Sequence, residues 1–492
     1  MQASRLILAL IVCAVSVTAE AHGFAQRYDL PVPLHLYVGG AAVAVALSFV
    51  VVAFFVRGDR TVSSYPTFNL LNTIVGRTLA SRFVCFALRL FAVFMLVLIV
   101  VAGLIGDTDP FKNIAPTAVW VVWWVGLAYI SGLLGDLWAL INPWKSVFES
   151  IEWLFAKLMP NRSFGLNRNY PERLGNWPAA VLFIWFIWAE LIWMSSDTPA
   201  NISQMVITYS VITWTGMFVF GCRTWLRNGE VFTVIFGLLA RFAPTEYIAE
   251  RNEWNLRPWA VGLLPDKAIS VPLTVFVLLM LSSVTFDGLL ATPLWGAIAQ
   301  WMLVSDLVRP FILLLQDITG NAIAAISTIA LIVFLVVFQI LYLAFSTLMY
   351  FSTPARARAH LTIGEVARLF VLSLIPIALA YHLAHYLSFL LIVGQYMIPL
   401  SSDPFGFGWD LFGTKIYFPD IGIVNAKFVW ITSVIAVVTG HIIAVWLAHV
   451  VALRRFGGSG AALRSQIPML FLMVGYTMLS LWILAQPVVE TT

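Results

Sequence analysis

The chain has 492 residues, of which 61% are hydrophobic and only 11% charged, with 20 tryptophans and a formal net charge of +4. Soluble globular domains carry about 25% charged residues, so this composition excludes an ordinary soluble enzyme or binding domain. It predicts one polytopic membrane domain with the lipid bilayer as its surroundings. The surplus of basic residues does not indicate a nucleic-acid partner, because membrane topology alone concentrates Lys and Arg in cytoplasmic loops.

The beginning of the chain has the pattern of an export signal. Arg5 precedes the apolar stretch "LILALIVCAVSV", and the Ala-Glu-Ala at 19–21 fits a cleavage site. We therefore expect residues 1–21 to be a cleavable signal peptide and residues 22–492 to form a single membrane domain, with an uncleaved anchor as the alternative. A mature terminus at His22 would offer an amine and an imidazole to one copper ion, as in a histidine brace, or it would be a frayed, solvated end.

Ten apolar stretches are long enough to cross about 30 Å of hydrocarbon. They are continuous rather than alternating, which favours helices over the strands of a membrane barrel. The predicted spans are residues 34–56, 84–106, 116–140, 177–196, 204–226, 268–292, 322–348, 364–398, 428–453 and 467–488. The predicted fold is an all-α integral membrane bundle of about ten transmembrane helices.

Four segments between the spans have a character of their own. Residues 143–158 and 229–244 predict amphipathic helices along the cytoplasmic interface, the first with apolar residues on one face and Lys and Glu on the other. Residues 293–317 contain two short apolar pieces interrupted by charged residues, which predicts a re-entrant or surface helix pair. Residues 399–427, rich in glycine and aromatic residues, predict an ordered periplasmic cap over the two helices that flank them.

The distribution of Lys and Arg predicts the orientation of the bundle. If the mature N-terminus lies outside, twenty of the 28 Lys and Arg residues fall in inward loops and five in outward segments. Cytoplasmic loops carry such an excess of basic residues. We therefore expect a bacterial inner-membrane protein with both mature termini in the periplasm.

Three carboxylates lie within the predicted spans. Asp136 falls near the inner end of the third span, Glu190 in the outer half of the fourth and Asp287 in the outer half of the sixth. Ionisable groups inside a membrane are costly and often mark an ion or substrate path. The alternative for each is that it ends a helix or lies at the interface.

Four histidines fall on the eighth and ninth predicted spans. His382 and His385, in "YHLAHYLSFLLIVG", are three residues apart and share a helix face. On a straight helix, His385 and His441 each lie about 20 Å below the outer surface, whereas His449 lies about 12 Å deeper than His441. The eighth stretch is longer than a bilayer requires, so we expect it to tilt, to start at the interface or to kink at Pro376.

Three interpretations of these histidines remain open. Neutral imidazole binds transition metals and haem iron, and it also relays protons. His382, His385, His441 and His449 are therefore candidates for a haem b or transition-metal site, or for a proton or substrate path. Alternatively, each hydrogen-bonds a neighbouring helix, as polar residues in membrane bundles often do. The spacing matches no established metal, haem, nucleotide or hydrolase motif.

Two classes of function follow. In the first, the protein is a secondary transporter or permease that moves a small solute or ion with proton or ion coupling, and Glu190, Asp287 and Asp136 belong to its path. In the second, His382, His385 and His441 ligate haem or a metal in a membrane redox component. The scattered carboxylates favour the transporter, which is the main prediction, and the clustered histidines favour the redox protein.

Overall fold

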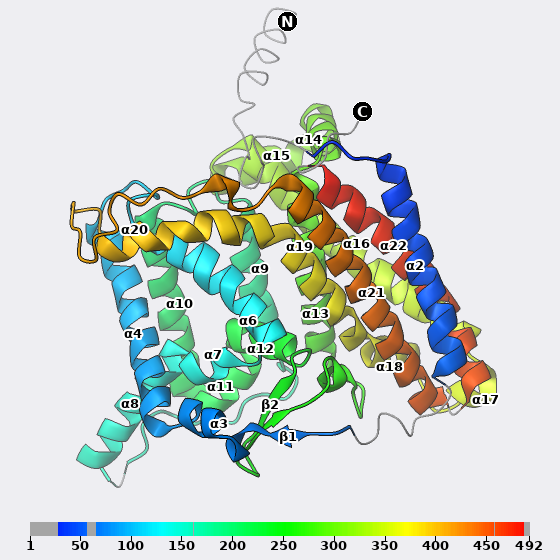
Figure 1. The fold of residues 1–492 in the computed structure, drawn as a ribbon, viewed down its shortest axis with the longest axis horizontal. Coiled ribbons are helices and arrows are strands. Elements are labelled where there is room, and N and C mark those ends of the chain that lie inside the picture. Colours follow the sequence, from blue (N-terminus) through cyan, green and yellow to red (C-terminus); the bar gives the residue numbers. More distant parts are fainter. Residues whose placement is uncertain (1–27, 57–64, 161, 457, 487–492) are drawn as a thin grey trace, which may run out of the picture.

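The computed structural model describes residues 28–56, 65–160, 162–456 and 458–486, so the predicted signal peptide and His22 lie outside the described residues. Among the described residues, nine helices are long and apolar enough to cross a membrane, and a bent helix pair could count as a tenth. Figure 1 shows these helices as a bundle. The predicted all-α, multi-helix fold is confirmed.

The long helical spans coincide with nine of the predicted ones. They are α2 (Leu34–Phe55), α4 (Arg82–Ile105), α5 to α6 (Ile114–Leu133), α10 (Pro199–Phe220), α13 (Val271–Leu290), α16 (Ala322–Ser352), α18 to α20 (Ile363–Ser402), α21 (Ala426–Phe456) and α22 (Ser459–Ala485). The span from α5 to α6 consists of α5 (Ile114–Pro116), the π-helical η3 (Thr117–Gly126) and α6 (Leu127–Leu133).

Shorter elements connect these spans. The helices are α3 (Ile74–Leu79), α7 (Leu137–Ile141), α8 (Pro143–Leu158), α9 (Trp177–Leu191), α11 (Cys222–Asn228), α12 (Val231–Ala240), α14 (Pro293–Val304), α15 (Arg309–Thr319) and α17 (Ala355–Arg358). The strands are β1 (Phe68–Asn69), β2 (Thr245–Ile248) and β3 (Glu253–Leu256), and single 3-10 turns are η2 (Leu70–Asn72), η4 (Val261–Leu263) and η7 (Ile421–Ile423).

The fourth predicted span, residues 177–196, is shorter in the structure. Helix α9 has 15 residues and ends at Leu191, which corresponds to about 22 Å of helix. It still connects the two ends of the bundle: Asn176 before it donates to the carbonyl of Arg227 on α11, and Met194 after it contacts Asn321 at the start of α16. The predicted helix is therefore present but too short by about a turn.

Of the three expectations for the eighth span, the structure shows an interruption of the helix near Pro376. The 3-10 turn η5 (Val371–Leu374) interrupts the helix between α18 (Ile363–Phe370) and α19 (Ile375–Val393), directly before Pro376. Proline has no backbone N–H and its ring clashes with the preceding turn, which breaks a helix at this point. A second 3-10 turn, η6 (Gly394–Tyr396), leads into α20 (Met397–Ser402), which runs across one end of the bundle in Figure 1.

The prediction of an interfacial helix at residues 229–244 is wrong. Helix α12 is buried at eight of its ten residues and contacts α6, α9 and α19 inside the bundle. Its apolar residues lie all round the helix instead of on one face, and such a helix is buried. By contrast, α8 buries only Pro143, Trp144 and Phe148, and most of its second half is exposed, including Ile151, Leu154 and Leu158 of the predicted apolar face.

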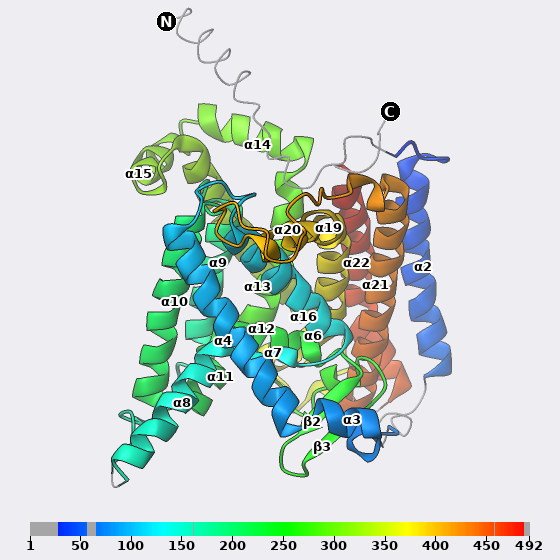
Figure 2. The same cartoon turned by 60° about the vertical axis from the view of Figure 1, so that its left-hand side comes forward.

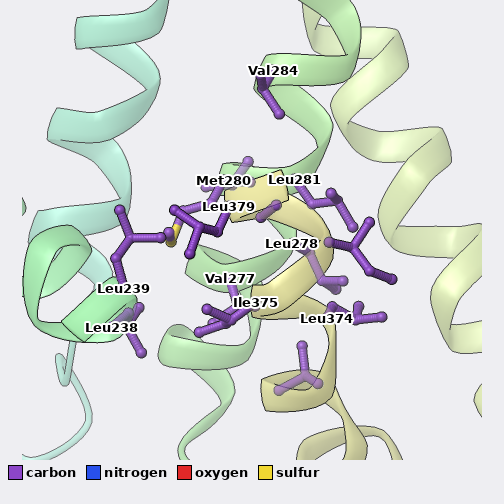
Figure 3. Close-up of a cluster of buried hydrophobic side chains, with 14 of the residues drawn as sticks. Leu238, Leu239, Val277, Leu278, Met280, Leu281, Val284, Leu374, Ile375 and Leu379 are labelled. Carbon is purple, nitrogen blue, oxygen red and sulfur yellow. The ribbon is translucent and has the colours of Figure 1, made fainter. Parts of the chain in front are cut away.

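The elements before and after α12, α11 and β2, both lie toward the lower edge of the molecule in Figure 1. Helix α12 thus enters the bundle and the chain leaves it again on the same side. Its apolar side chains form one cluster with α13 and α19, shown in Figure 3 and including Leu238, Leu239, Val277, Met280, Val284, Ile375 and Leu379.

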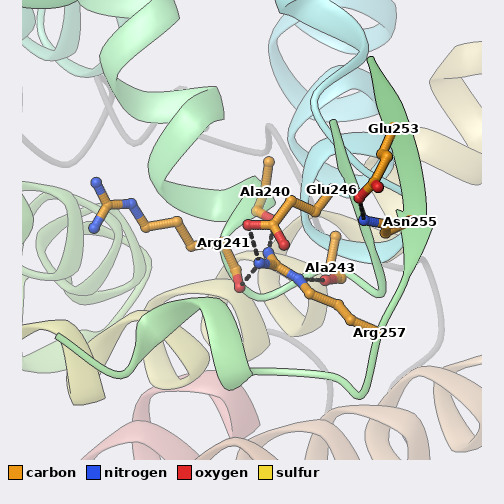
Figure 4. Close-up of polar contacts among 7 residues, drawn as sticks. All are labelled: Ala240, Arg241, Ala243, Glu246, Glu253, Asn255 and Arg257. Carbon is orange, nitrogen blue, oxygen red and sulfur yellow. Dashed lines mark hydrogen bonds and ion pairs between the residues drawn. The ribbon is translucent and has the colours of Figure 1, made fainter. Parts of the chain in front are cut away.

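Arg257 caps the carboxyl end of α12. Strands β1, β3 and β2 form an antiparallel sheet in that order, and Arg257 follows β3. Its guanidinium pairs with Glu246 at 2.6 Å and donates to the carbonyls of Ala240, Arg241 and Ala243, as Figure 4 shows. The last carbonyls of a helix lack intrahelical partners and carry partial negative charge, so a cation there satisfies them.

Replacing Arg257 by methionine should therefore destabilise the protein. The side chain is only 5% exposed, and the variant leaves Glu246 and three carbonyls without their charged donor. We expect a loss of about 2–4 kcal/mol in the free energy of unfolding, measured by detergent-induced unfolding in mixed micelles. The exposed Arg251 of the same hairpin, changed to methionine, is the control, and equal losses in both variants would contradict the capping role.

Two outer segments were predicted, a re-entrant or surface helix pair at residues 293–317 and an ordered cap at residues 399–427. Helices α14 and α15 are bent by 106° relative to each other and lie across one end of the bundle in Figures 1 and 2, as a surface pair would. In residues 399–427, the carbonyl of Phe405 accepts from the amide of Asp107, just after α4, and that of Pro404 accepts from the amide of Ile114, at the start of α5. The side-chain oxygen of Gln395 then accepts from Tyr417 and from the amide of Asp420. The segment is tied to the bundle at both points, and its first half lies over α4 and α5 instead of the histidine helices.

Candidate functional site

A chain of polar side chains connects three helices inside the bundle. The hydroxyl of Tyr386 on α19 lies 2.6 Å from Oδ2 of Asp287 on α13 and 3.2 Å from Oε1 of Glu190 on α9. The Nε2 atom of His385 lies 2.9 Å from the same Oδ2 of Asp287. The indole N–H of Trp124, in η3, donates to Oε1 of Glu190 at 2.6 Å. We call Glu190, Tyr386, Asp287 and His385 the polar chain.

The positions of these residues in their helices explain why the side chains lie together. Asp287 lies three residues before the end of α13 and Glu190 one residue before the end of α9, so the polar chain lies toward the end of the bundle that carries α14. The side chains of His385 and Asp287 are only 7% and 13% exposed. The neighbouring positions of His385 and Tyr386 on α19 direct two polar groups at the same carboxylate.

His382 lies one helical turn before Tyr386 on the same face of α19. Its ring centroid is 4.7 Å from that of Tyr386, 5.8 Å from that of Trp124 and 5.9 Å from that of Tyr129. Within the part of the chain that the structure describes, neither ring nitrogen has a hydrogen-bond partner. The predicted neighbours His382 and His385 thus differ: His385 is paired with a carboxylate, and His382 is surrounded by aromatic rings.

A small cavity of about 30 Å³ adjoins the polar chain. Glu190, Asp287, His382 and Tyr386 supply its polar wall, and apolar side chains from α12 and α13 close it, including Leu239, Met280 and Val284 of the cluster in Figure 3. A volume of this size holds about one water-sized guest, and a polar wall is what such a guest requires. The site is therefore small and polar on one side.

His441 does not join the polar chain. Its Nδ1 bonds the carbonyl of Val437 in its own helix at 2.8 Å, and its ring packs beside Tyr476 of α22, whose hydroxyl bonds that of Thr285. Among the described residues, no three His, Cys, Asp or Glu side chains lie close enough to share a metal ion. His382, His385 and His441 therefore do not form one three-residue metal site among the described residues, and the haem interpretation stays a prediction.

His449 and Asp136 have structural partners. The ring of His449 bonds the carbonyl of Val56 at 3.0 Å and the side chain of Gln466 at 3.1 Å, which joins α2, α21 and α22. Asp136 accepts from the amide of Ala139 at 2.9 Å and caps α7. The contacts of His449 are those of helix packing, and the contact of Asp136 is that of a helix end. Neither residue lines the cavity.

Replacing His449 by alanine should weaken the bundle without affecting function. It removes two hydrogen bonds between helices, and polar contacts between membrane helices are worth about 0.6 kcal/mol each on average. We expect a loss of about 1 kcal/mol in the free energy of unfolding in mixed micelles. If the variant were as inactive as a substitution at Asp287, His449 would belong to a longer path.

Glu230 is a polar centre that the sequence analysis missed. Its side chain is completely buried and caps α12 by accepting from the amides of Phe232 and Thr233. It also accepts from the side chains of Trp138, Asn142, Tyr209 and Thr233. The signal available in the sequence was a carboxylate directly before an apolar run, which is a helix-start pattern.

Tyr386 and Trp124 were also missed. Aromatic residues make up 14% of the sequence, so no pattern distinguishes those two from the aromatic side chains that only fill the core. No known protein-family model, curated protein or solved structure shows significant similarity to this chain. The assignment of function therefore rests on the geometry of the site.

Proposed function

We propose that the chain is a secondary transporter of the bacterial inner membrane that moves a small solute or ion, coupled to proton binding at Asp287, His385 and Glu190. The observation that carries the proposal is the polar chain itself. A buried carboxylate is paired with a histidine, and one tyrosine hydroxyl bridges it to a second carboxylate. Such groups inside a membrane bundle are costly and typically serve ion or proton paths.

The hydrogen bonds of the polar chain depend on whether one of its carboxyl groups is protonated. A tyrosine hydroxyl has one proton to donate, and that of Tyr386 faces carboxylate oxygens of both Asp287 and Glu190. Both contacts are hydrogen bonds only when one of the two carboxyl groups carries a proton. Adding or removing that proton changes the contacts between α9, α13 and α19, which is how proton binding would alter the packing of these helices.

The surrounding backbone also favours transport. Helix α12 is a short buried helix whose Leu239 lines the cavity, while η3 and η5 interrupt neighbouring helices. In secondary transporters, broken or partial helices surround the binding site, and rocking of one half against the other exposes it alternately. The polar cavity is small, so we expect a small substrate. In this proposal, both termini of the mature chain lie in the periplasm.

The test is transport by the purified protein in phospholipid liposomes that contain a pH-sensitive dye. A panel of small organic acids, amines, sugars and inorganic ions is added outside under an imposed pH gradient. We expect one class of solute to cause proton movement that depends on the protein, with protein-free liposomes as the control. A Soret band or stoichiometric iron or copper in the purified protein, without such movement, would instead establish the redox alternative.

A further inference from the structure

A second and much larger cavity lies between α4, η3, α9 and α10. Its volume is about 950 Å³, and apolar and aromatic side chains dominate its wall, among them Phe91, Met95, Trp123, Phe186 and Met205. We call it the apolar cavity. It is separate from the polar cavity, because Trp123 faces one and the adjacent Trp124 the other, with the ring of Phe186 only 4.7 Å from that of Trp124.

Several polar groups in the wall of the apolar cavity are already bonded within the protein. The indole N–H of Trp120 donates to the carbonyl of Ser196, that of Trp138 to Glu230 and that of Trp144 to Ser210. The hydroxyl of Tyr209 bonds Glu230, and that of Ser401 bonds a carbonyl of its own helix. The wall is therefore suited to hydrocarbon and poorly suited to a polar solute.

The apolar cavity is open along α4. Phe91 and Phe94, which line it, are 60% and 55% exposed. Helix α4 is held toward one end by Ser203, which donates to the carbonyls of Ile99 and Val100, and toward the other by Arg89, which donates to the carbonyl of Leu140. In a membrane, the exposed face of this apolar helix faces lipid, so hydrocarbon chains reach the cavity directly from the bilayer.

The size of the cavity requires a large occupant. Engineered apolar cavities of about 150 Å³ stay dry and take up benzene, and pockets for whole ligands range from about 300 to 1,000 Å³. At about 950 Å³, the apolar cavity matches the largest of these. An apolar wall around this volume suits a large apolar group such as an acyl chain.

Two cations contact α7 beside the cavity, next to residues of its wall but outside the wall itself. Arg89 follows the lining residue Leu88, and Lys145 donates to the carbonyl of Ala139, close to the lining residue Ile141. A guanidinium has five N–H donors and an ammonium three, so each can donate to a phosphate in addition to these carbonyls. The phosphate of a lipid bound at this end would lie outside the apolar wall, and an acyl chain of the same lipid would lie inside the cavity.

We propose that the apolar cavity binds one anionic glycerophospholipid from the bilayer, with an acyl chain against η3 and α10 and its phosphate at Arg89 and Lys145. The lipid forms part of the wall on which η3 packs. The fold offers this site for a lipid whether or not the polar chain couples transport to protons.

The test is native mass spectrometry of the delipidated full-length protein, titrated with phosphatidylglycerol or with phosphatidylcholine. We expect one lipid per protein and about tenfold tighter binding of phosphatidylglycerol. Ala92→Trp, which fills the cavity from α4, should weaken binding of both lipids at least tenfold, and so should Val122→Trp from η3. Ala87→Trp, on the exposed side of α4 and outside the cavity wall, is the matched control and should bind as the wild type does.

The phosphate contact has its own variant. Arg89→Gln should abolish the preference for phosphatidylglycerol while phosphatidylcholine still binds, whereas Arg82→Gln, at the start of α4, should retain the preference. Unaltered lipid binding in folded Ala92→Trp and Val122→Trp would overturn the proposal. So would equal binding of both lipids by the wild type, or a tightly bound molecule of another class that phosphatidylglycerol does not displace.

Discussion

Replacing Asp287 by asparagine should reduce proton-coupled solute movement to the level of protein-free liposomes, while the protein remains folded. Asparagine has nearly the same shape and can still hydrogen-bond Tyr386 and His385, which lie 2.6 and 2.9 Å from the carboxylate. It can neither take up a proton nor pair with a charged imidazole. Because a polar contact between membrane helices is worth at most about 1.7 kcal/mol, the loss of stability should stay below about that value.

Infrared difference spectra between acidic and alkaline solution test the same substitution without a known substrate. The wild type should show the carbonyl band of a protonated carboxyl group in the membrane domain, and Asp287→Asn should remove or shift it. The control is Asp306→Asn, because Asp306 is exposed on the turn between α14 and α15 and should affect neither measurement. A folded Asp287→Asn variant with normal transport would contradict proton coupling at this site.

His382 and His385 should respond differently to alanine. Removal of the His385 ring takes the imidazole partner from Asp287, so transport should fail as in Asp287→Asn. His382 contacts aromatic rings and lines the cavity, so its loss should alter the preference for the solute more than the coupling to protons. The liposome assay with a solute series separates the two outcomes, and equal defects in both variants would favour one shared role.

The sequence was sufficient for the spans because an apolar run of bilayer length has few alternatives to a membrane helix. It was insufficient for α12. Residues 229–244 follow the fifth span much as residues 143–158 follow the third, and both are too short to cross. The two segments differ in sequence, because α12 is apolar all round whereas residues 143–158 are amphipathic. The burial of α12 also needs partners for its two ends, which Glu230 and Arg257 supply. The contact of Arg257 comes from a hairpin that no local pattern connects to the helix.

Only the ionisable residues of the site could be predicted from the sequence. Glu190, Asp287 and the histidines were identified because polar groups in apolar spans are costly. Their partners depend on how each helix is rotated about its axis, which spacing along one helix cannot determine. His385 faces Asp287 on α13, whereas His441 faces Tyr476 on α22. Equal depth in the membrane therefore did not bring the histidines into one group, and the hydroxyl that bridges the carboxylates, Tyr386, has no distinguishing pattern.

Replacing Glu230 by leucine should cause the largest loss of stability of any single substitution considered. The carboxylate is completely buried and accepts hydrogen bonds from the first turn of α12, from α10 and from the region of α7. Leucine fills the space but leaves these buried donors without an acceptor. Removing one partner of a buried charged network costs about 3–5 kcal/mol, so little monodisperse protein should be recovered by size-exclusion chromatography.

The glutamine variant distinguishes loss of hydrogen bonds from loss of charge. A glutamine side chain at this position would keep one acceptor oxygen of the right shape but would lose the negative charge at the amino end of α12, where the helix dipole favours an anion. Glu230→Gln should therefore fold, with a free energy of unfolding about 1–3 kcal/mol lower than that of the wild type, and should transport normally. Glu250→Leu, at an exposed position in the hairpin, controls for the substitution itself. If Glu230→Gln folds as stably as the wild type but transports nothing, Glu230 is a further proton site instead of the anchor of α12.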